Sequence, residues 1–105
     1  MKRKLREEGQ LFQHVRNAAL PYITVILDRL GIVYRQCGHE IQMLNPTRAD
    51  NHFGSFSISV RTGRWAEFAT GDKGGDVVSL VAYLQGERQI DAAKDLARML
   101  GMSDE

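Results

Sequence analysis

Basic and aromatic side chains are interleaved through the middle of this 105-residue chain, between an Asn-Pro pair and a glycine-rich segment. The basic residues are Arg48, Arg61, Arg64 and Lys73, and the aromatic residues among them are Phe53, Trp65 and Phe68. In proteins that bind single-stranded nucleic acids, cations follow the phosphates while exposed rings stack on bases, each stack contributing about 1–3 kcal/mol. The pattern therefore favours nucleic-acid contact, in which the cations hold phosphates and Trp65 stacks if its ring is exposed.

Charge limits the strength of such an interaction. Asp50, Glu67 and Asp72 lie within the same stretch, and the whole chain has a formal net charge of only +1. Residues 1–16 hold five basic and two acidic groups, whereas residues 76–105 hold three basic and six acidic groups. We therefore expect binding to be weak, salt-sensitive and confined to the first part and middle of the chain. An ordinary solvated sheet edge is the alternative interpretation of the same residues.

The segment Gly71-Asp72-Lys73-Gly74-Gly75-Asp76 also has possible chemistry, since glycine N–H groups before a helix can cradle a phosphate. A nucleotide-binding loop of this kind has Lys followed by Ser or Thr at the helix start. Here Lys73 precedes two glycines, and Asp76 stands where a carboxylate would cap the helix. The segment therefore favours a tight turn followed by a helix N-cap.

No residue pattern indicates catalysis or metal binding. Asp72 and Asp76 lack the supporting constellation and nucleotide site that metal-dependent polymerase chemistry requires. Cys37 is the only cysteine, which excludes an intrachain disulfide. The side chains that could supply soft metal donors are His14, Cys37, His39 and His52. Their spacing is not typical of a zinc site. We expect no enzymatic activity, no bound metal and no cofactor.

The elements that position these residues follow from apolar spacing and from helix-breaking residues. Residues 1–10 are highly charged and are predicted to form a flexible basic tail. Apolar residues then recur at helical spacing across 11–19 and 22–30, with Pro21 between the two segments. Short β-like runs follow at 32–34 and 41–44, and Cys37-Gly38 between them indicates a hairpin.

A second hairpin is predicted in the middle of the chain. Residues 55–60 alternate strictly between serine and apolar residues, which is typical of a strand with one buried face. Thr62-Gly63 predicts a tight turn, and residues 64–68 return as the partner strand. Because a shift of one residue in register exchanges the two faces, the sequence leaves open which of Trp65 and Phe68 is buried.

Apolar stripes at 77–84 and 90–100 predict two C-terminal helices, which end near Gly86 and Gly101. Residues 11–105 are therefore expected to form a single α+β domain, with a small antiparallel sheet of four strands, an N-terminal helix and two C-terminal helices. With 43% hydrophobic and 26% charged residues, the chain suits one compact domain. It has no apolar run of membrane-spanning length and no secretory signal, so we expect no membrane partner and a cytoplasmic location.

From about Leu30 to Met102, the order of motifs resembles the zinc-binding (zinc-ribbon) domain of DnaG-type bacterial primases and of phage and plasmid primase-helicases. In that family a Cys-Pro-Phe-His stretch precedes a Pro-Ser-Phe strand, a hairpin and a Cys-x-x-Cys-Gly-x-Gly-Gly-Asp helix start. This sequence keeps Pro46, Ser55-Phe56-Ser57 and Gly74-Gly75-Asp76. All four zinc-ligand positions are replaced, and they hold Asn45, Arg48, Phe68 and Gly71.

The resemblance implies a metal-free zinc-ribbon scaffold, in which hydrophobic packing that includes a buried Phe68 replaces the ion. It further implies a non-enzymatic module that binds single-stranded DNA in the replication or DNA transfer of a phage, plasmid or other mobile genetic element. The residues expected to contact nucleic acid are Arg48, Arg61, Arg64, Trp65 and Lys73. The alternative is an adaptor that binds a primase, helicase or other replication protein, which exposed apolar residues on the C-terminal helices would favour.

Overall fold

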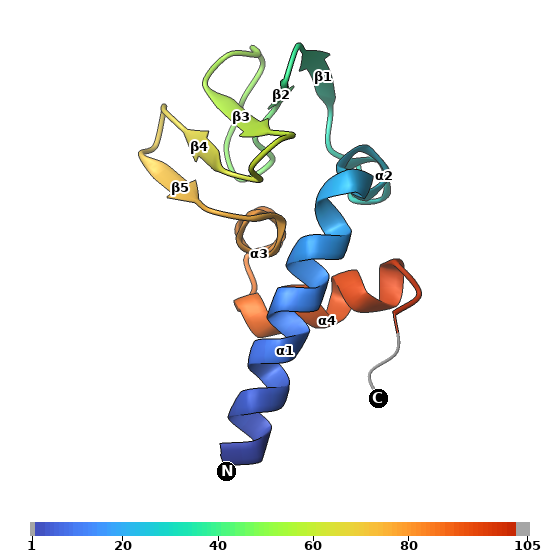
Figure 1. Ribbon diagram of the computed structural model, residues 1–105. Coiled ribbons are helices and arrows are strands. Elements are labelled where there is room, and N and C mark those ends of the chain that lie inside the picture. Colours follow the sequence, from blue (N-terminus) through green and yellow to red (C-terminus); the bar gives the residue numbers. More distant parts are fainter. Residues whose placement is uncertain (1, 103–105) are drawn as a thin grey trace.

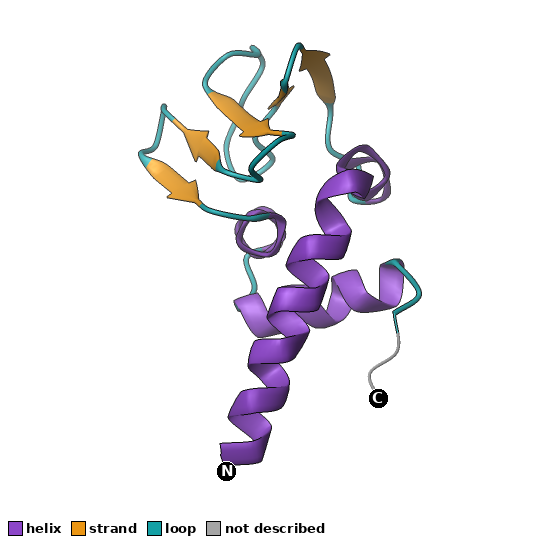
Figure 2. Ribbon diagram, in the orientation of Figure 1, coloured by secondary structure: helices purple, strands orange, loops and turns teal. Residues whose placement is uncertain are grey.

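A computed structural model describes residues 2–102, with side chains described from Gly9 onward. Helices precede and follow the strands in the sequence and lie on one side of the sheet, so the predicted α+β class is confirmed (Figures 1 and 2). The elements in chain order are α1 (Lys2–Ala19), the 3₁₀ helix η1 (Leu20–Tyr22), α2 (Ile23–Arg29), β1 (Tyr34–Cys37), β2 (Glu40–Met43), β3 (Phe56–Ser59), β4 (Trp65–Glu67), β5 (Asp72–Gly74), α3 (Val77–Gln85) and α4 (Gln89–Met99). None of the described helices combines the length and hydrophobicity that crossing a bilayer requires.

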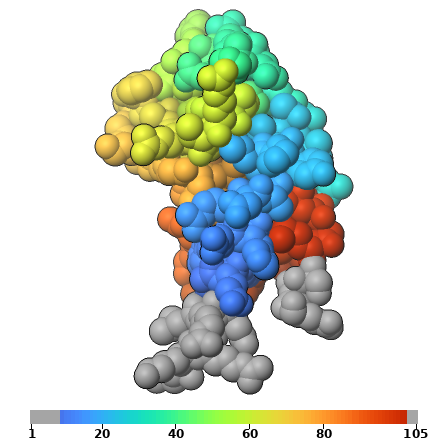
Figure 3. Space-filling view, in the orientation of Figure 1, coloured from blue at the N-terminus to red at the C-terminus, as the bar shows by residue number. Residues whose placement is uncertain are grey.

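The first helix is longer than its apolar pattern indicated. α1 begins at Lys2, so residues 2–10, which were predicted to form a flexible tail, are helical instead. Its apolar residues Val15 and Ala19 lie one helical turn apart and are fully buried. Through this face α1 packs against α3 and α4 (Figure 3). Pro21 then falls in the first turn of η1, where a proline ring is tolerated, and the chain turns into α2.

The sheet is a meander of five antiparallel strands in the order β1-β2-β3-β4-β5. The pairs β1–β2 and β3–β4 are the two predicted hairpins. β5 is a fifth strand that the sequence did not predict, because Asp72–Gly74 was assigned to a tight turn. Its backbone pairs with β4 although glycine and aspartate are poor strand formers, so tertiary pairing overrides local propensity there.

One face of the sheet is buried under the helices. The inward apolar residues of β2, β3 and β4 are Ile41, Met43, Phe56, Ile58 and Trp65. The register pairs Trp65 with Ile58, which places the indole ring inside at 6% exposure. Phe68 is 78% exposed, so the prediction that this ring is buried is wrong.

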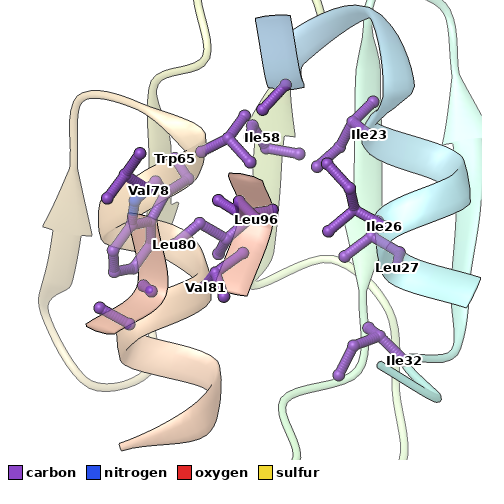
Figure 4. Packing of buried hydrophobic residues seen from close by; sticks show 14 of the residues in the cluster. Ile23, Ile26, Leu27, Ile32, Ile58, Trp65, Val78, Leu80, Val81 and Leu96 are labelled. Atoms are coloured by element: carbon purple, nitrogen blue, oxygen red, sulfur yellow. The ribbon is translucent and has the colours of Figure 1, made fainter. Parts of the chain in front are cut away.

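α3 begins and ends at the residues that the sequence indicated. Asp76 is extended at φ −158° and caps α3, since its carboxylate accepts the Ser79 N–H at 2.8 Å. Gly86, at φ 63°, ends α3 in the left-handed region, which glycine adopts without steric cost. The buried apolar residues of α3 and α4 pack against those of the sheet and α2 (Figure 4).

Aromatic rings form the part of the core beneath β3 and β4. The ring centroids of Phe56 and Trp65 lie 6.0 Å apart, and those of Trp65 and Tyr83 lie 4.9 Å apart. The indole N–H of Trp65 donates to Ser79 Oγ at 3.0 Å, so the polar atom of this buried ring is satisfied. α3 is thereby attached to the sheet by both apolar packing and a hydrogen bond.

Candidate nucleic-acid interface

The outer face of the sheet, away from the helices, is polar and carries small side chains at its centre. Register aligns one residue from each strand in a row across this face, and the row is Arg35, Gln42, Ser57, Ala66 and Lys73. Because side chains alternate along a strand, these residues point away from the buried face. A cation stands on each edge strand with uncharged residues between them in this row. The carboxylate of Glu40 lies on the same face and accepts a hydrogen bond from Ser57 at 3.3 Å.

Arg64 and Lys73 border a hollow of about 540 Å³ on β4 and β5, here called the strand hollow. The main chain of Gly74 and Gly75 completes its lining together with Trp65 and Ala66, and no acidic residue contributes to it. Within residues 9–102, neither the Arg64 guanidinium nor the Lys73 ammonium has a hydrogen-bond or ion-pair partner. Two uncompensated cations beside one hollow suit an anionic ligand such as a phosphate.

Arg61 lies outside the strand hollow. It is exposed in the turn between β3 and β4, and its Nη2 lies 2.8 Å from His39 Nε2, which must therefore accept a hydrogen bond. Arg61 lines a second hollow of about 350 Å³, here called the helix hollow, between α1, this turn and the start of α3. The structure thus separates Arg61 from the pair formed by Arg64 and Lys73.

Arg48 points into the protein rather than across the outer face. Its Nη2 donates to Ser55 Oγ at 3.0 Å and lies 3.4 Å from both Glu67 Oε2 and Asp50 Oδ1. These partners engage Nη2 from inside the domain, whereas the buried Nε of Arg48 has no hydrogen-bond partner among the described residues. The structure therefore places Nη2 of Arg48 in an interior polar cluster, while the side chain as a whole remains 32% exposed. The sequence signal for this cluster was Glu67, an acidic residue within a predicted strand, which the sequence analysis counted only as a charge that weakens phosphate binding.

The rings available for stacking differ from the expected one. Trp65 is buried and hydrogen-bonded to Ser79, so it presents no face to a base. Phe68 directly follows β4 and exposes most of its ring. At the opposite edge of the sheet, on β1, the Arg35 guanidinium lies 4.8 Å from the centroid of the Phe53 ring. Sequence reasoning missed Arg35, although the alternation of the first hairpin could have placed it on the outer face.

The positions that the resemblance assigns to lost zinc ligands come together around Glu67. Asn45 Nδ2 donates to Glu67 Oε2 at 3.0 Å, and the Arg48 guanidinium lies 3.4 Å from the same oxygen. The Gly71 N–H donates to the Glu67 backbone carbonyl at 2.8 Å, and Phe68 is the next residue in the chain. Among the residues described, no group of three or more His, Cys, Asp or Glu side chains is placed to hold a metal ion. A hydrogen-bonded carboxylate, rather than apolar packing, joins these turns.

Glu67 is completely buried, yet its pKa is lowered, which favours the ionised form of its carboxyl group. Burial alone would raise its pKa, but the hydrogen bonds from Asn45, Ser55 and the Ala69 amide, together with the charge of Arg48, lower the pKa below its ordinary value. The Ala69 N–H donates to Oε1 at 3.1 Å, so both carboxylate oxygens are engaged. Glu67 is thus a structural anion that is neutralised from within.

No family model matches the sequence, and a search of the curated proteins also finds no match. Function is therefore inferred from the side chains themselves: the polar outer face, the strand hollow with two cations that have no partner within residues 9–102, and the exposed ring of Phe68.

Proposed function

We propose that this chain is a non-enzymatic module that binds single-stranded nucleic acid, DNA in the first place, on the outer face of its sheet. The observation that carries the proposal is that Arg64 and Lys73 both border the strand hollow, which has no acidic lining. Neither cation has a hydrogen-bond or ion-pair partner among the residues whose side chains are described. A phosphodiester group matches this site, since its anionic oxygens accept hydrogen bonds from both side chains.

The exposed ring of Phe68 favours a single strand over a duplex. Base faces are accessible for stacking only where bases are unpaired, and such a stack contributes about 1–3 kcal/mol. Strand alternation places Phe68 on the same side of the chain as Ala66, which forms part of the strand hollow. A nucleotide with its phosphate in the hollow therefore has a ring nearby for a base.

The resemblance to the primase zinc-binding domain supports the same ligand. On that basis we place the module in the cytoplasm, in the replication or DNA transfer of a phage, plasmid or other mobile genetic element. In this proposal the contacts of Glu67 with Asn45 and Arg48 replace the bound ion as the link between the two turns. The chain supplies a binding surface and no catalytic group.

Fluorescence anisotropy with labelled oligo(dT) of about twelve nucleotides, measured over a range of salt concentrations, tests the proposal. Arg64→Ala combined with Lys73→Ala should weaken binding and lower the slope of log Kd against log salt by about 1.4, because two phosphate contacts are lost. The matched control, Arg29→Ala with Lys94→Ala, removes the same charge from α2 and α4 and should bind nearly as the wild type does. Equal losses in both variants, or no wild-type binding at low salt, would refute the proposal.

Phe68→Ala tests the stacking surface separately. This variant should lose about 1–3 kcal/mol of binding free energy, whereas Phe68→Trp should retain or improve binding. Its melting temperature should match the wild type, because the ring is exposed and contributes little to the core. Tyr22→Ala removes another exposed ring, on η1, and should leave binding unchanged.

The alternative, an adaptor for a primase, helicase or other replication protein, loses its main motive. The apolar stripes of α3 and α4 are mostly buried, although Leu84, Ile90 and Leu100 are half-buried. Neither helix carries an exposed large apolar residue among those described. The exposed large apolar side chains among the described residues are Tyr22 on η1, Val25 on α2, Val33 before β1 and Phe68 after β4. Binding to a purified primase or helicase, without any binding to single strands, would favour the adaptor.

A further inference from the structure

Gly75 has no internal reason to be glycine. Its φ lies outside the left-handed region, and a Cβ built on it would meet no atom within 4 Å. The adjacent Gly74 differs, since a Cβ there would lie 2.4 Å from both Trp65 Nε1 and Ser79 Oγ. Gly63 differs too, because its φ is 79°. A glycine that neither conformation nor packing demands leaves the main chain bare toward solvent, where a ligand can approach it closely.

Gly75 belongs to both hollows. It lines the strand hollow with Arg64 and Lys73, and it also lines the helix hollow. The helix hollow is bordered by Arg16 on α1 and by Arg61 in the turn between β3 and β4. The space-filling view shows these segments adjoining on one face, with α1 in blue, the turn in yellow and the start of α3 in orange (Figure 3). The two hollows therefore meet at a residue without a side chain.

The helix hollow contains one carboxylate, which is already engaged. Asp76 Oδ1 accepts the Ser79 N–H at 2.8 Å, and Asp76 Oδ2 lies 3.6 Å from Arg16 Nε. The Arg16 side chain nevertheless remains 51% exposed, which leaves its other guanidinium N–H groups for a ligand. Arg61 contacts His39 through a single nitrogen and is also exposed. The hollow thus retains positive character although an acidic residue lines it.

We infer that a single nucleic-acid strand crosses Gly75, with one phosphate held by Arg64 and Lys73 and another held by Arg16 and Arg61. This inference rests on the proposed function and extends its site from the sheet to α1. The bare main chain of Gly75 lets the sugar-phosphate backbone pass between the hollows and offers an N–H donor on the way. Strands long enough to enter both hollows bind more tightly than strands that fill only the strand hollow.

Gly75→Leu tests this path by placing a side chain between the hollows. The backbone conformation and the open space at this position accept a side chain, so the variant should fold. Gly9→Leu is the matched control, because Gly9 is also an exposed glycine with no atom near a built Cβ, and it lies outside both hollows. Thermal unfolding followed by circular dichroism should show both variants folded.

Binding is then measured with oligo(dT) of about four and about twelve nucleotides. With the longer strand, Gly75→Leu should raise Kd roughly tenfold, as expected when a hydrogen bond to a phosphate and its close approach are lost. Arg16→Gln should lower the salt slope by about 0.7 for the longer strand, as one phosphate contact is lost. The shorter strand is expected to bind only in the strand hollow. Its Kd for Arg16→Gln should therefore equal its Kd for the wild type.

Two outcomes overturn the path without touching the proposed function. In the first, Gly75→Leu and Arg16→Gln bind the longer strand as the wild type does, while Arg64→Ala with Lys73→Ala loses it. In the second, Arg16→Gln weakens both strand lengths equally, which indicates bulk charge instead of a defined contact. Failure of the wild type to bind either strand refutes the path and the proposed function together.

Discussion

The side-chain amide of Asn45 donates to the buried carboxylate of Glu67 over 3.0 Å, and so joins the loop after β2 to the end of β4. The same amide nitrogen lies 2.9 Å from the Tyr83 hydroxyl on α3, and its carbonyl oxygen accepts the Thr47 N–H. One buried side chain therefore connects the loop, the sheet and a helix. Buried polar groups that are fully hydrogen-bonded in this way specify a single arrangement of the elements around them.

Glu67→Gln keeps the shape of this side chain and removes the charge that Arg48 faces. We expect the variant to lose about 1–3 kcal/mol of unfolding free energy at pH 7, measured by urea denaturation. The pKa of Glu67 is lowered in the folded state, so its stabilising contribution is present above the unfolded-state pKa and is lost as pH falls through the folded-state pKa. The difference between variant and wild type should therefore shrink in acid.

Glu40→Gln is the control for this effect, because Glu40 is an exposed carboxylate on β2 that accepts one hydrogen bond from Ser57. Its stability should stay within about 0.5 kcal/mol of the wild type. If Glu67→Gln changed stability no more than Glu40→Gln does, the buried cluster would not be the link between the turns.

Glu87 should show the opposite pH dependence. Burial, the hydrogen bond and charge of Asp95, and the charge of Asp91 raise the pKa of Glu87, while Arg98 offsets part of this. A raised pKa means that the contribution to stability is present below the unfolded-state pKa and is lost as pH rises through the folded-state pKa. Glu87→Gln should therefore melt at a higher temperature than the wild type at neutral pH and lose this advantage in acid. Identical melting curves at neutral pH would contradict the assignment.

The adjacent glycines Gly74 and Gly75 should respond differently to the same substitution. Gly74→Ala places a Cβ 2.4 Å from the Trp65 indole nitrogen and from Ser79 Oγ, and the packed indole ring cannot move freely. We expect a loss of about 1–3 kcal/mol, as for other overpacked cores. Gly75→Ala meets open space and should be neutral or slightly stabilising. Thermal unfolding of both variants checks this, and equal melting temperatures would show that the contact around Trp65 is not tight.

Metal chelation should leave the protein unchanged. Proteins that need structural zinc unfold when a chelator removes the ion. Here the corresponding turns are held by the contacts of Glu67 with Asn45, Arg48 and the main chain of Ala69 and Gly71. The melting temperature should therefore be the same with and without EDTA. Stoichiometric zinc in protein purified without chelator, or a lower melting temperature in EDTA, would contradict this expectation.

Features that depend on neighbouring residues in the chain could be predicted from the sequence. The alternation of serine and apolar residues at 55–60 predicted the strand β3, because burial of one face of a strand makes every second residue apolar. The carboxylate of Asp76 gave the start of α3, because a free N–H at a helix start needs an acceptor. Gly101, at φ 70°, follows the end of α4, as its position after an apolar stripe indicated.

Features that depend on pairing between distant segments could not be predicted from the sequence. Asn45 and Glu67 are 22 residues apart, and nothing in either local sequence marks them as partners. The register that buries Trp65 and exposes Phe68 is set by pairing with β3, and a shift of one residue would reverse it. The sequence therefore indicated Arg64 and Lys73 as residues of the candidate site. It did not indicate that Arg16 of α1 lines the adjoining helix hollow.

The packing of α1 against α3 and α4 sets the time at which this domain can fold in the cell. α1 is synthesised before α3 and α4, the helices against which it packs. At a synthesis rate of about 5–20 residues per second, several seconds pass before those helices exist. Throughout that interval the apolar side chains of α1, including Val15 and Ala19, lack the helices against which they pack in the folded domain.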